Sequence, residues 1–200
     1  NWTLDLLYEY AEKATKDLDG DTVIDFEVDQ CGLGGNSGLT YIFFKGAGGT
    51  FMEPDPDGGV KIVFGEEKNI DIMNDIMTRF SQKKVYADWT NEGTQKSFRE
   101  GRMLFFNFGF GAMNWLRDMT FDYGVVPAPK RDAAQENYLC NVCYWGNSFM
   151  GIPKTADAER SAKIADVLSA ESLYTVRDAC VENSIKYKYA RSDEDTEMIN

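Results

Sequence analysis

The 200-residue sequence contains no histidine, and this absence removes a large part of enzyme chemistry. Serine and cysteine nucleophiles are commonly activated by a neighbouring imidazole, so Ser-His-Asp and Cys-His arrangements cannot be built from these residues. Zinc sites that combine cysteine with histidine are excluded for the same reason. Carboxylate chemistry stays open, because the chain has 33 acidic residues.

Long apolar runs and positive charge are also scarce. No segment approaches the ~18 consecutive apolar residues of a transmembrane helix. The formal net charge of −12 argues against nucleic acid as a partner and against electrostatic docking on anionic lipid. The chain opens at Asn1 directly before a helical pattern, without a signal peptide, and it closes at Asn200 without a terminating signal. We therefore expect an interior piece of a longer protein, with its targeting information elsewhere.

Cysteine is limited to four residues, Cys31, Cys140, Cys143 and Cys180. The close pair at 140 and 143 has no second pair and no histidine with which to form a zinc knuckle. It also lies in an apolar, aromatic run, whereas a thioredoxin-like pair would stand at the start of a helix. We expect the cysteines to be structural, either free or disulfide-bonded.

Aromatic residues are in excess, at 14% of the chain. Such rings fill cores, and they also provide flat apolar surfaces on which sugars stack. Because helical and strand-like patterns alternate, the predicted class is α/β. Apolar periodicity predicts helices at 2–16, 39–46, 69–84, 90–100, 156–168 and 171–182. Alternating or β-branched runs predict strands at 22–28, 60–64, 102–107 and 123–126, and the glycines of 32–38 predict a loop.

Six segments occur in an order and at spacings that resemble one protein family. The segment Tyr123-Gly124-Val125-Val126-Pro127-Ala128-Pro129-Lys130 is similar to the motif Y-G-V-x-P-x-P-K, and Gly151-Ile152-Pro153-Lys154-Thr155 is similar to G-I-P-K-T. The other four segments are 1–7, 17–26, 98–103 and 186–194. Together they resemble the extracellular solute-binding proteins of sugar ABC importers, of the Gram-positive lipoprotein type. Two departures are Thr22, where the family usually has glycine, and Phe26, where Tyr-Gly is common.

The resemblance implies a periplasmic-binding-protein-like fold, in which a mixed sheet flanked by helices forms each lobe and a ligand cleft lies between two lobes. Residues 1–138 would form most of the second lobe. Residues 139–200 would form a hinge crossing plus helices that belong to, or return from, the first lobe. The whole protein would be extracellular, lipid-anchored through a segment outside this chain, monomeric, and partnered by an ABC transporter permease.

Loop residues at strand ends are the natural place for a solute site. The resemblance points to a polar contact at Asn36 and an aromatic one at Tyr41. It also points to a stacking ring at Phe110, with Trp115 as the next choice. Further candidates at the proposed second hinge crossing are Trp145 and Asn147. The alternative for each ring is a place in the core, and it is favoured for Phe105, Phe106 and Phe108.

An Asp-rich loop is a separate candidate site. Acidic oxygens at alternate positions suit a hard cation such as Ca²⁺. The proposed ligands are Asp17, Asp19, Asp21, the backbone carbonyl of Val23, and Asp25. The glycine at the fourth position and Val28 at the twelfth depart from an EF-hand, so a solvated turn that follows the first helix is the alternative.

Three functions compete at this point. The first is a non-catalytic protein that binds a small solute, most plausibly a carbohydrate, and requires no cofactor beyond the calcium considered above. The second is a carbohydrate hydrolase with paired carboxylates ~5–10 Å apart across a cleft. The third is a surface or adhesion domain, which predicts no stabilisation by any small molecule.

Overall fold

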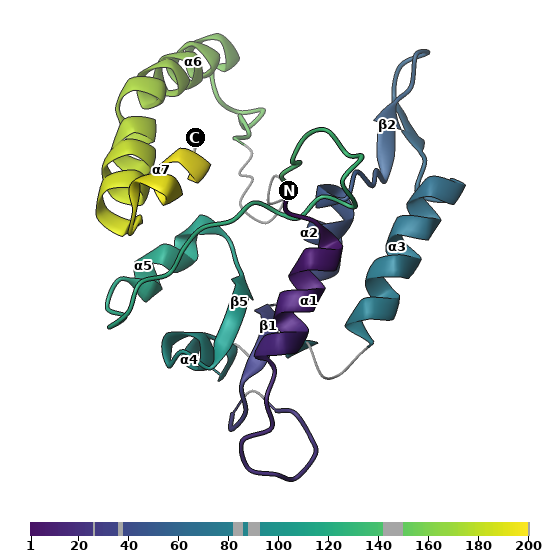
Figure 1. Cartoon of the computed structure of the whole chain (residues 1–200). Coiled ribbons are helices and arrows are strands. Elements are labelled where there is room, and N and C mark those ends of the chain that lie inside the picture. The colour runs from purple at the N-terminus through teal and green to yellow at the C-terminus, as the bar shows by residue number, and fades with distance from the viewer. Residues whose placement is uncertain (26, 36–37, 82–85, 88–92, 142–149, 200) are drawn as a thin grey trace. The chain divides into compact units, whose positions relative to one another are not determined.

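The computed structural model describes residues 1–25, 27–35, 38–81, 86–87, 93–141 and 150–199 (Figure 1). The chain forms two compact units. The first contains Asn1–Phe108 and Pro127–Asn141, and the second contains Gly109–Val126 and Val142–Asn200. The assignment of 1–138 and 139–200 to lobes of a larger protein stays a prediction. Among the described residues, no helix combines the length and apolar character needed to cross a bilayer.

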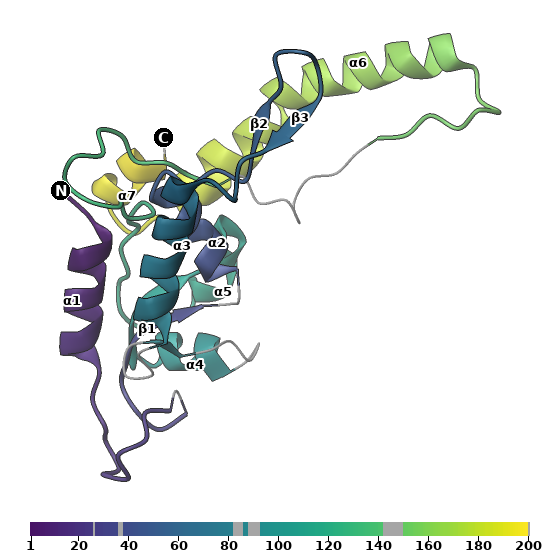
Figure 2. The ribbon, with the colours of Figure 1, turned by 90° about the vertical axis from the view of Figure 1, so that its right-hand side faces the viewer.

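A small parallel sheet organises the first unit. Its central strand, β1 (Cys31–Gly35), lies between β4 (Tyr86–Ala87) and β5 (Met103–Asn107), and both neighbours run parallel to it. A separate antiparallel hairpin pairs β2 (Met52–Pro54) with β3 (Val60–Ile62), and Figure 2 shows it near one end of α3. With helices packed against the parallel strands, the predicted α/β class with mixed strand pairing is confirmed.

Four helices complete the first unit: α1 (Leu4–Ala14), α2 (Leu39–Gly46), α3 (Glu67–Phe80) and α4 (Gly93–Arg99). The side chain of Thr3 caps α1 by accepting a hydrogen bond from the backbone N–H of Leu6. The shared core contains apolar residues from α1, β1, α2 and α3. It consists chiefly of Leu4, Leu7, Leu33, Leu39, Phe43, Phe44, Ile72 and Ile76.

The glycine-rich segment forms the central strand β1, so the predicted loop at 32–38 is wrong over its first part. Glycine is required here because helix and strands approach the backbone closely. A Cβ on Gly32 would lie 1.9 Å from the carbonyl oxygen of Ala11 in α1, and one on Gly34 would lie 2.3 Å from the Met103 side chain. Such glycines mark tight packing within a sheet.

The predicted strand at 22–28 is also wrong. Instead, Thr22 adopts a left-handed backbone conformation with φ of +69°. A strand would pair its backbone N–H groups with a neighbouring strand, but here aspartate side chains accept them. Asp21 accepts from the N–H of Val23, and Asp25 accepts from the N–H groups of Glu27 and Val28. Aspartate competes with regular pairing in this way, and the alternating residues form a loop.

The second unit is helical in its described part. It contains the 3₁₀ turn η1 (Phe110–Ala112), α5 (Met113–Leu116), α6 (Ala158–Tyr174), a π-helix labelled η3 (Asp178–Tyr189) and α7 (Asp193–Ile199). Helix α6 is capped by Asp157 and continues to Tyr174, across the break between the two helices predicted at 156–168 and 171–182. The predicted strand at 123–126 is absent from this described segment.

Candidate functional site

The carboxyl ends of β1 and β5 lie side by side in the first unit. The register pairs Gly35, the last residue of β1, with Asn107, the last residue of β5. The chain enters α2 shortly after β1 and reaches Phe108 directly after β5. Ligands of open α/β folds bind outside the carboxyl ends of parallel strands. This edge of the sheet is therefore the candidate solute site.

Two stacked pairs of aromatic rings come from β5 and from the segments that follow β1 and β5. The ring of Tyr41, on α2, stacks on Phe51 with centroids 5.4 Å apart and planes 19° from parallel. At the end of β5, the rings of Phe106 and Phe108 stack at 5.7 Å and 15°. All four rings are partly exposed, which places them at the margin of the core. Rings in such positions offer apolar faces to a ligand while packing behind supports them.

The other predicted ligand contacts are distributed differently. Phe110 lies in η1 and Trp115 lies in α5, two adjoining elements of the second unit, and their exposed fractions are 48% and 43%. Tyr41 belongs to the first unit. The residues Asn36, Trp145 and Asn147 lie outside the described part of the chain. The ligand role of all six residues stays a prediction.

The Asp-rich loop brings three of its predicted metal ligands together. One carboxylate oxygen from each of Asp17, Asp19 and Asp21 lies within 4.8 Å of the others, and all three side chains are exposed. The Asp25 carboxylate is not in this group and accepts instead from nearby backbone N–H groups. Val23 is exposed. Three of the five predicted ligands thus form a cluster of the hard oxygen donors that calcium prefers.

Hydrogen bonds, desolvation and neighbouring charges shift the pKa values of Asp17 and Asp19. The pKa of Asp17 is lowered, because the backbone N–H groups of Gly20 and Thr22 donate to its carboxylate at 2.6 and 2.8 Å. For Asp19, a bond from the Asp21 N–H lowers the pKa, but desolvation and the neighbouring acids outweigh it and the pKa is raised. A cation would offset this repulsion, yet each carboxylate already supports the loop without one.

A buried aspartate that sequence reasoning missed closes the loop. Asp29 is 1% exposed and accepts hydrogen bonds from the N–H of Leu18 at 2.7 Å and of Asp25 at 2.9 Å. The guanidinium of Arg102 donates to its backbone carbonyl. The sequence signal was an acid placed two residues before a strand, after a turn rich in aspartate. Its geometry gives Asp29 a structural role that holds the two ends of the loop together.

Two of the segments that carry the family resemblance meet in the second unit. Asp195 is buried and accepts from the N–H of Val125 at 2.6 Å, while the hydroxyl of Tyr123 donates to the carbonyl of Tyr189. The guanidinium of Arg191 lies over the Tyr123 ring, 5.5 Å from its centroid. Burial raises the pKa of Tyr123, although Arg191 opposes the shift. These contacts hold 123–125 in place without a strand, and Tyr189 and Arg191 link the motif at 186–194 to the motif at 121–130.

The sequence matches no protein-family model and no curated protein. A solved structure described as a cyclo/maltodextrin-binding protein complexed with maltotetraose superposes on it with a TM-score of 0.55 and 16% sequence identity. The alignment covers 100% of this chain and 52% of that one, so the chain spans about half the length of its structural neighbour. The similarity shows a shared fold, which agrees with the expected periplasmic-binding-protein-like architecture.

Proposed function

We propose that this chain is part of an extracellular protein that binds a carbohydrate without chemically changing it. The observation that carries the proposal is the fold similarity over the whole chain to a maltodextrin-binding protein. The partly exposed aromatic rings of Tyr41, on the helix that follows β1, and of Phe108, directly after β5, add support, because sugar rings stack on aromatic faces. The absence of histidine leaves few routes to a nucleophilic enzyme.

Hinge closure is the proposed mode of action. Residues 1–138 would form most of the second lobe, and residues 139–200 would form the hinge crossing plus helices that belong to, or return from, the first lobe. A hinge of this kind permits two lobes to close on a ligand by small changes in backbone angles at the crossings. In this proposal the closed, liganded form is recognised by an ABC transporter permease, and the whole protein is monomeric and lipid-anchored outside the cell.

Calorimetric titration with maltotetraose tests sugar binding. We expect saturable heat with a negative heat-capacity change, because apolar ring faces become buried. Cellotetraose, which has the same number of glucose units in another linkage, is the matched control for specificity. Mass spectrometry of the recovered sugar must show an intact tetrasaccharide. Shorter products would favour the hydrolase alternative, and no heat with a broad panel of neutral oligosaccharides would refute the proposal.

Calcium is a second element of the proposal, with Asp17, Asp19 and Asp21 as the protein ligands. Calcium would neutralise three neighbouring carboxylates and stiffen the loop between α1 and β1. Adding millimolar Ca²⁺ to chelated protein should then raise the melting temperature. The Asp19→Asn variant should lose this response, whereas substitution of the exposed Asp57 on the β2–β3 turn should preserve it. A melting temperature indifferent to calcium would refute the metal site.

A further inference from the structure

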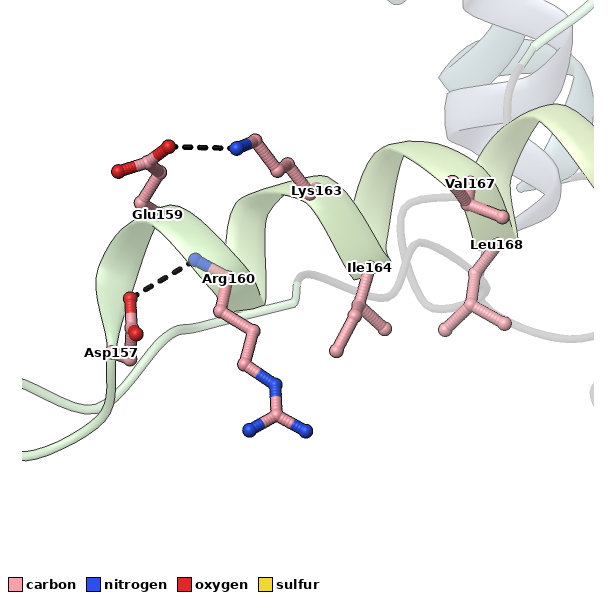
Figure 3. A pocket seen from close by; sticks show the side chains of 7 residues that line it. All are labelled: Asp157, Glu159, Arg160, Lys163, Ile164, Val167 and Leu168. Atoms are coloured by element: carbon pink, nitrogen blue, oxygen red, sulfur yellow. Dashed lines mark hydrogen bonds and ion pairs between the residues drawn. The ribbon is translucent and has the colours of Figure 1, made fainter.

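One face of α6 presents an apolar stripe to solvent. The helix has 17 residues, Ala158–Tyr174, and none of them is buried. Four apolar side chains follow helical spacing along one side, and we call them the α6 stripe: Ile164, Val167, Leu168 and Tyr174, with exposed fractions of 50, 60, 56 and 71%. Figure 3 shows Ile164 and Leu168 extending to the same side of the helix as Arg160.

The shape of this surface suits a polypeptide better than a small molecule. The shallow depression at the stripe is lined only by Asp157 and residues of α6 itself, so within the described residues no other helix or strand encloses it. Small ligands are usually enclosed from several sides. A flat apolar face on an amphipathic helix instead marks a surface that another secondary-structure element covers.

About half of the maltodextrin-binding neighbour has no counterpart in this chain. We propose that the α6 stripe packs against the equivalent half of the complete protein. This inference rests on the proposed function. The whole of this chain aligns with 52% of the neighbour, so the remainder of that fold must contact the aligned part somewhere. Helices of short length gain most of their stability by packing an apolar face, and α6 has such a face uncovered.

Charges on the same side define the occupant further. Arg160 lies near the amino end of the stripe and Glu171 near its carboxyl end, and both are exposed. The occupying element should therefore carry an acidic group near Arg160 and a basic group near Glu171, around an apolar centre. An antiparallel second copy of α6 would also meet this pattern, and the experiment must separate the two occupants.

Site-specific photo-cross-linking in the complete product of the gene tests the proposal. A benzophenone amino acid replaces Leu168 in one variant and Asp166, exposed on the opposite side of α6, in the matched control. We expect several-fold more cross-linked product at position 168, with the bond mapped to the same polypeptide outside residues 1–200. Bonds to a second copy, to residues within 1–200 or to unrelated proteins would overturn the proposal, as would equal yields at both positions.

Sugar binding is measured on the same two variants, so that the two ideas fail separately. If maltotetraose binds but the cross-links take one of the contradicting forms, the docking surface is wrong and the sugar-binding function stands. If the cross-links map as expected but no oligosaccharide binds, the docking surface stands and the proposed ligand class is wrong.

Discussion

Replacing Gly32 with alanine should destabilise the first unit strongly, because its space is already occupied by backbone. A Cβ at this position would lie 1.9 Å from the carbonyl oxygen of Ala11 and 2.5 Å from its Cα. Ordinary contacts begin near 3.4 Å, so α1 would have to move by about 1.5 Å, the difference between the two distances. Truncating the Ala11 side chain cannot relieve the clash, since the atoms concerned are main-chain atoms.

The expected loss follows from what α1 buries. Leu4, Leu7 and Ala11 are at most 2% exposed, so displacing the helix would open the packing of all three against the rest of the core. Overpacking usually costs about 1–3 kcal/mol, and a backbone clash belongs at or above the upper end. We therefore expect the Gly32→Ala variant to lose ~3 kcal/mol or more of unfolding free energy.

Urea unfolding followed by circular dichroism measures this loss. The matched control is Gly65→Ala, because a Cβ on Gly65 meets nothing within 4 Å and its φ is not positive. The control should lie within about 0.5 kcal/mol of the parent protein. If Gly32→Ala were as stable as Gly65→Ala, the close approach of α1 to β1 would be wrong, and with it the explanation of the glycine-rich strand.

Three other substitutions or treatments have definite outcomes. Thr22→Gly should stabilise the protein by about 1 kcal/mol in chemical denaturation, because a β-branched residue at φ of +69° is strained. Asp29→Ala should cost about 2–3 kcal/mol, because two backbone N–H groups lose their buried charged acceptor. Burial raises the pKa of Cys31 to about 11, so iodoacetamide at pH 8 should label the exposed Cys180 in the native protein and Cys31 only after unfolding. The same shift predicts falling stability as the pH rises from about 8.5, where the unfolded thiol ionises, to about 11, where the folded one does.

Periodic apolar patterns predicted the helices of the first unit well. In α3, Ile72 and Ile76 are buried at helical spacing, and in α1 the buried Leu4, Leu7 and Ala11 follow the same rule. A helix face that packs against a core must be apolar, so the spacing of apolar residues in the local sequence is enough to predict the helix. Boundaries were less certain, as α6 shows, because Thr155 and Asp157 were both suitable caps.

The failures have a different origin, since they depend on contacts distant in sequence. Glycine indicates a turn when it is read locally, and only the approach of Ala11 and Met103 makes β1 a strand of glycines. The β-branched residues at 22–28 indicate a strand locally, yet the buried carboxylate of Asp29 and the capping carboxylate of Asp25 hold a loop. In both cases tertiary packing or side-chain capping outweighs intrinsic propensity.

The same distinction explains how far the candidate site could be anticipated. Tyr41 was predicted from the resemblance to sugar-binding proteins, and the structure places it on α2, the helix that follows β1, while its ligand role stays a prediction. Phe108 was assigned to the core together with its aromatic neighbours Phe105 and Phe106, although its ring is only partly buried and stacks on Phe106 beyond the end of β5. Aromatic residues in a run look alike in sequence, and only the strand register separates a ring packed inside from one placed at the sheet edge.

Substituting Phe108 by leucine should therefore weaken maltotetraose binding, whereas Phe105→Leu should chiefly lower stability, since Phe105 packs against Trp2 and the main core. Equal binding by the two variants at matched stability would place the sugar elsewhere.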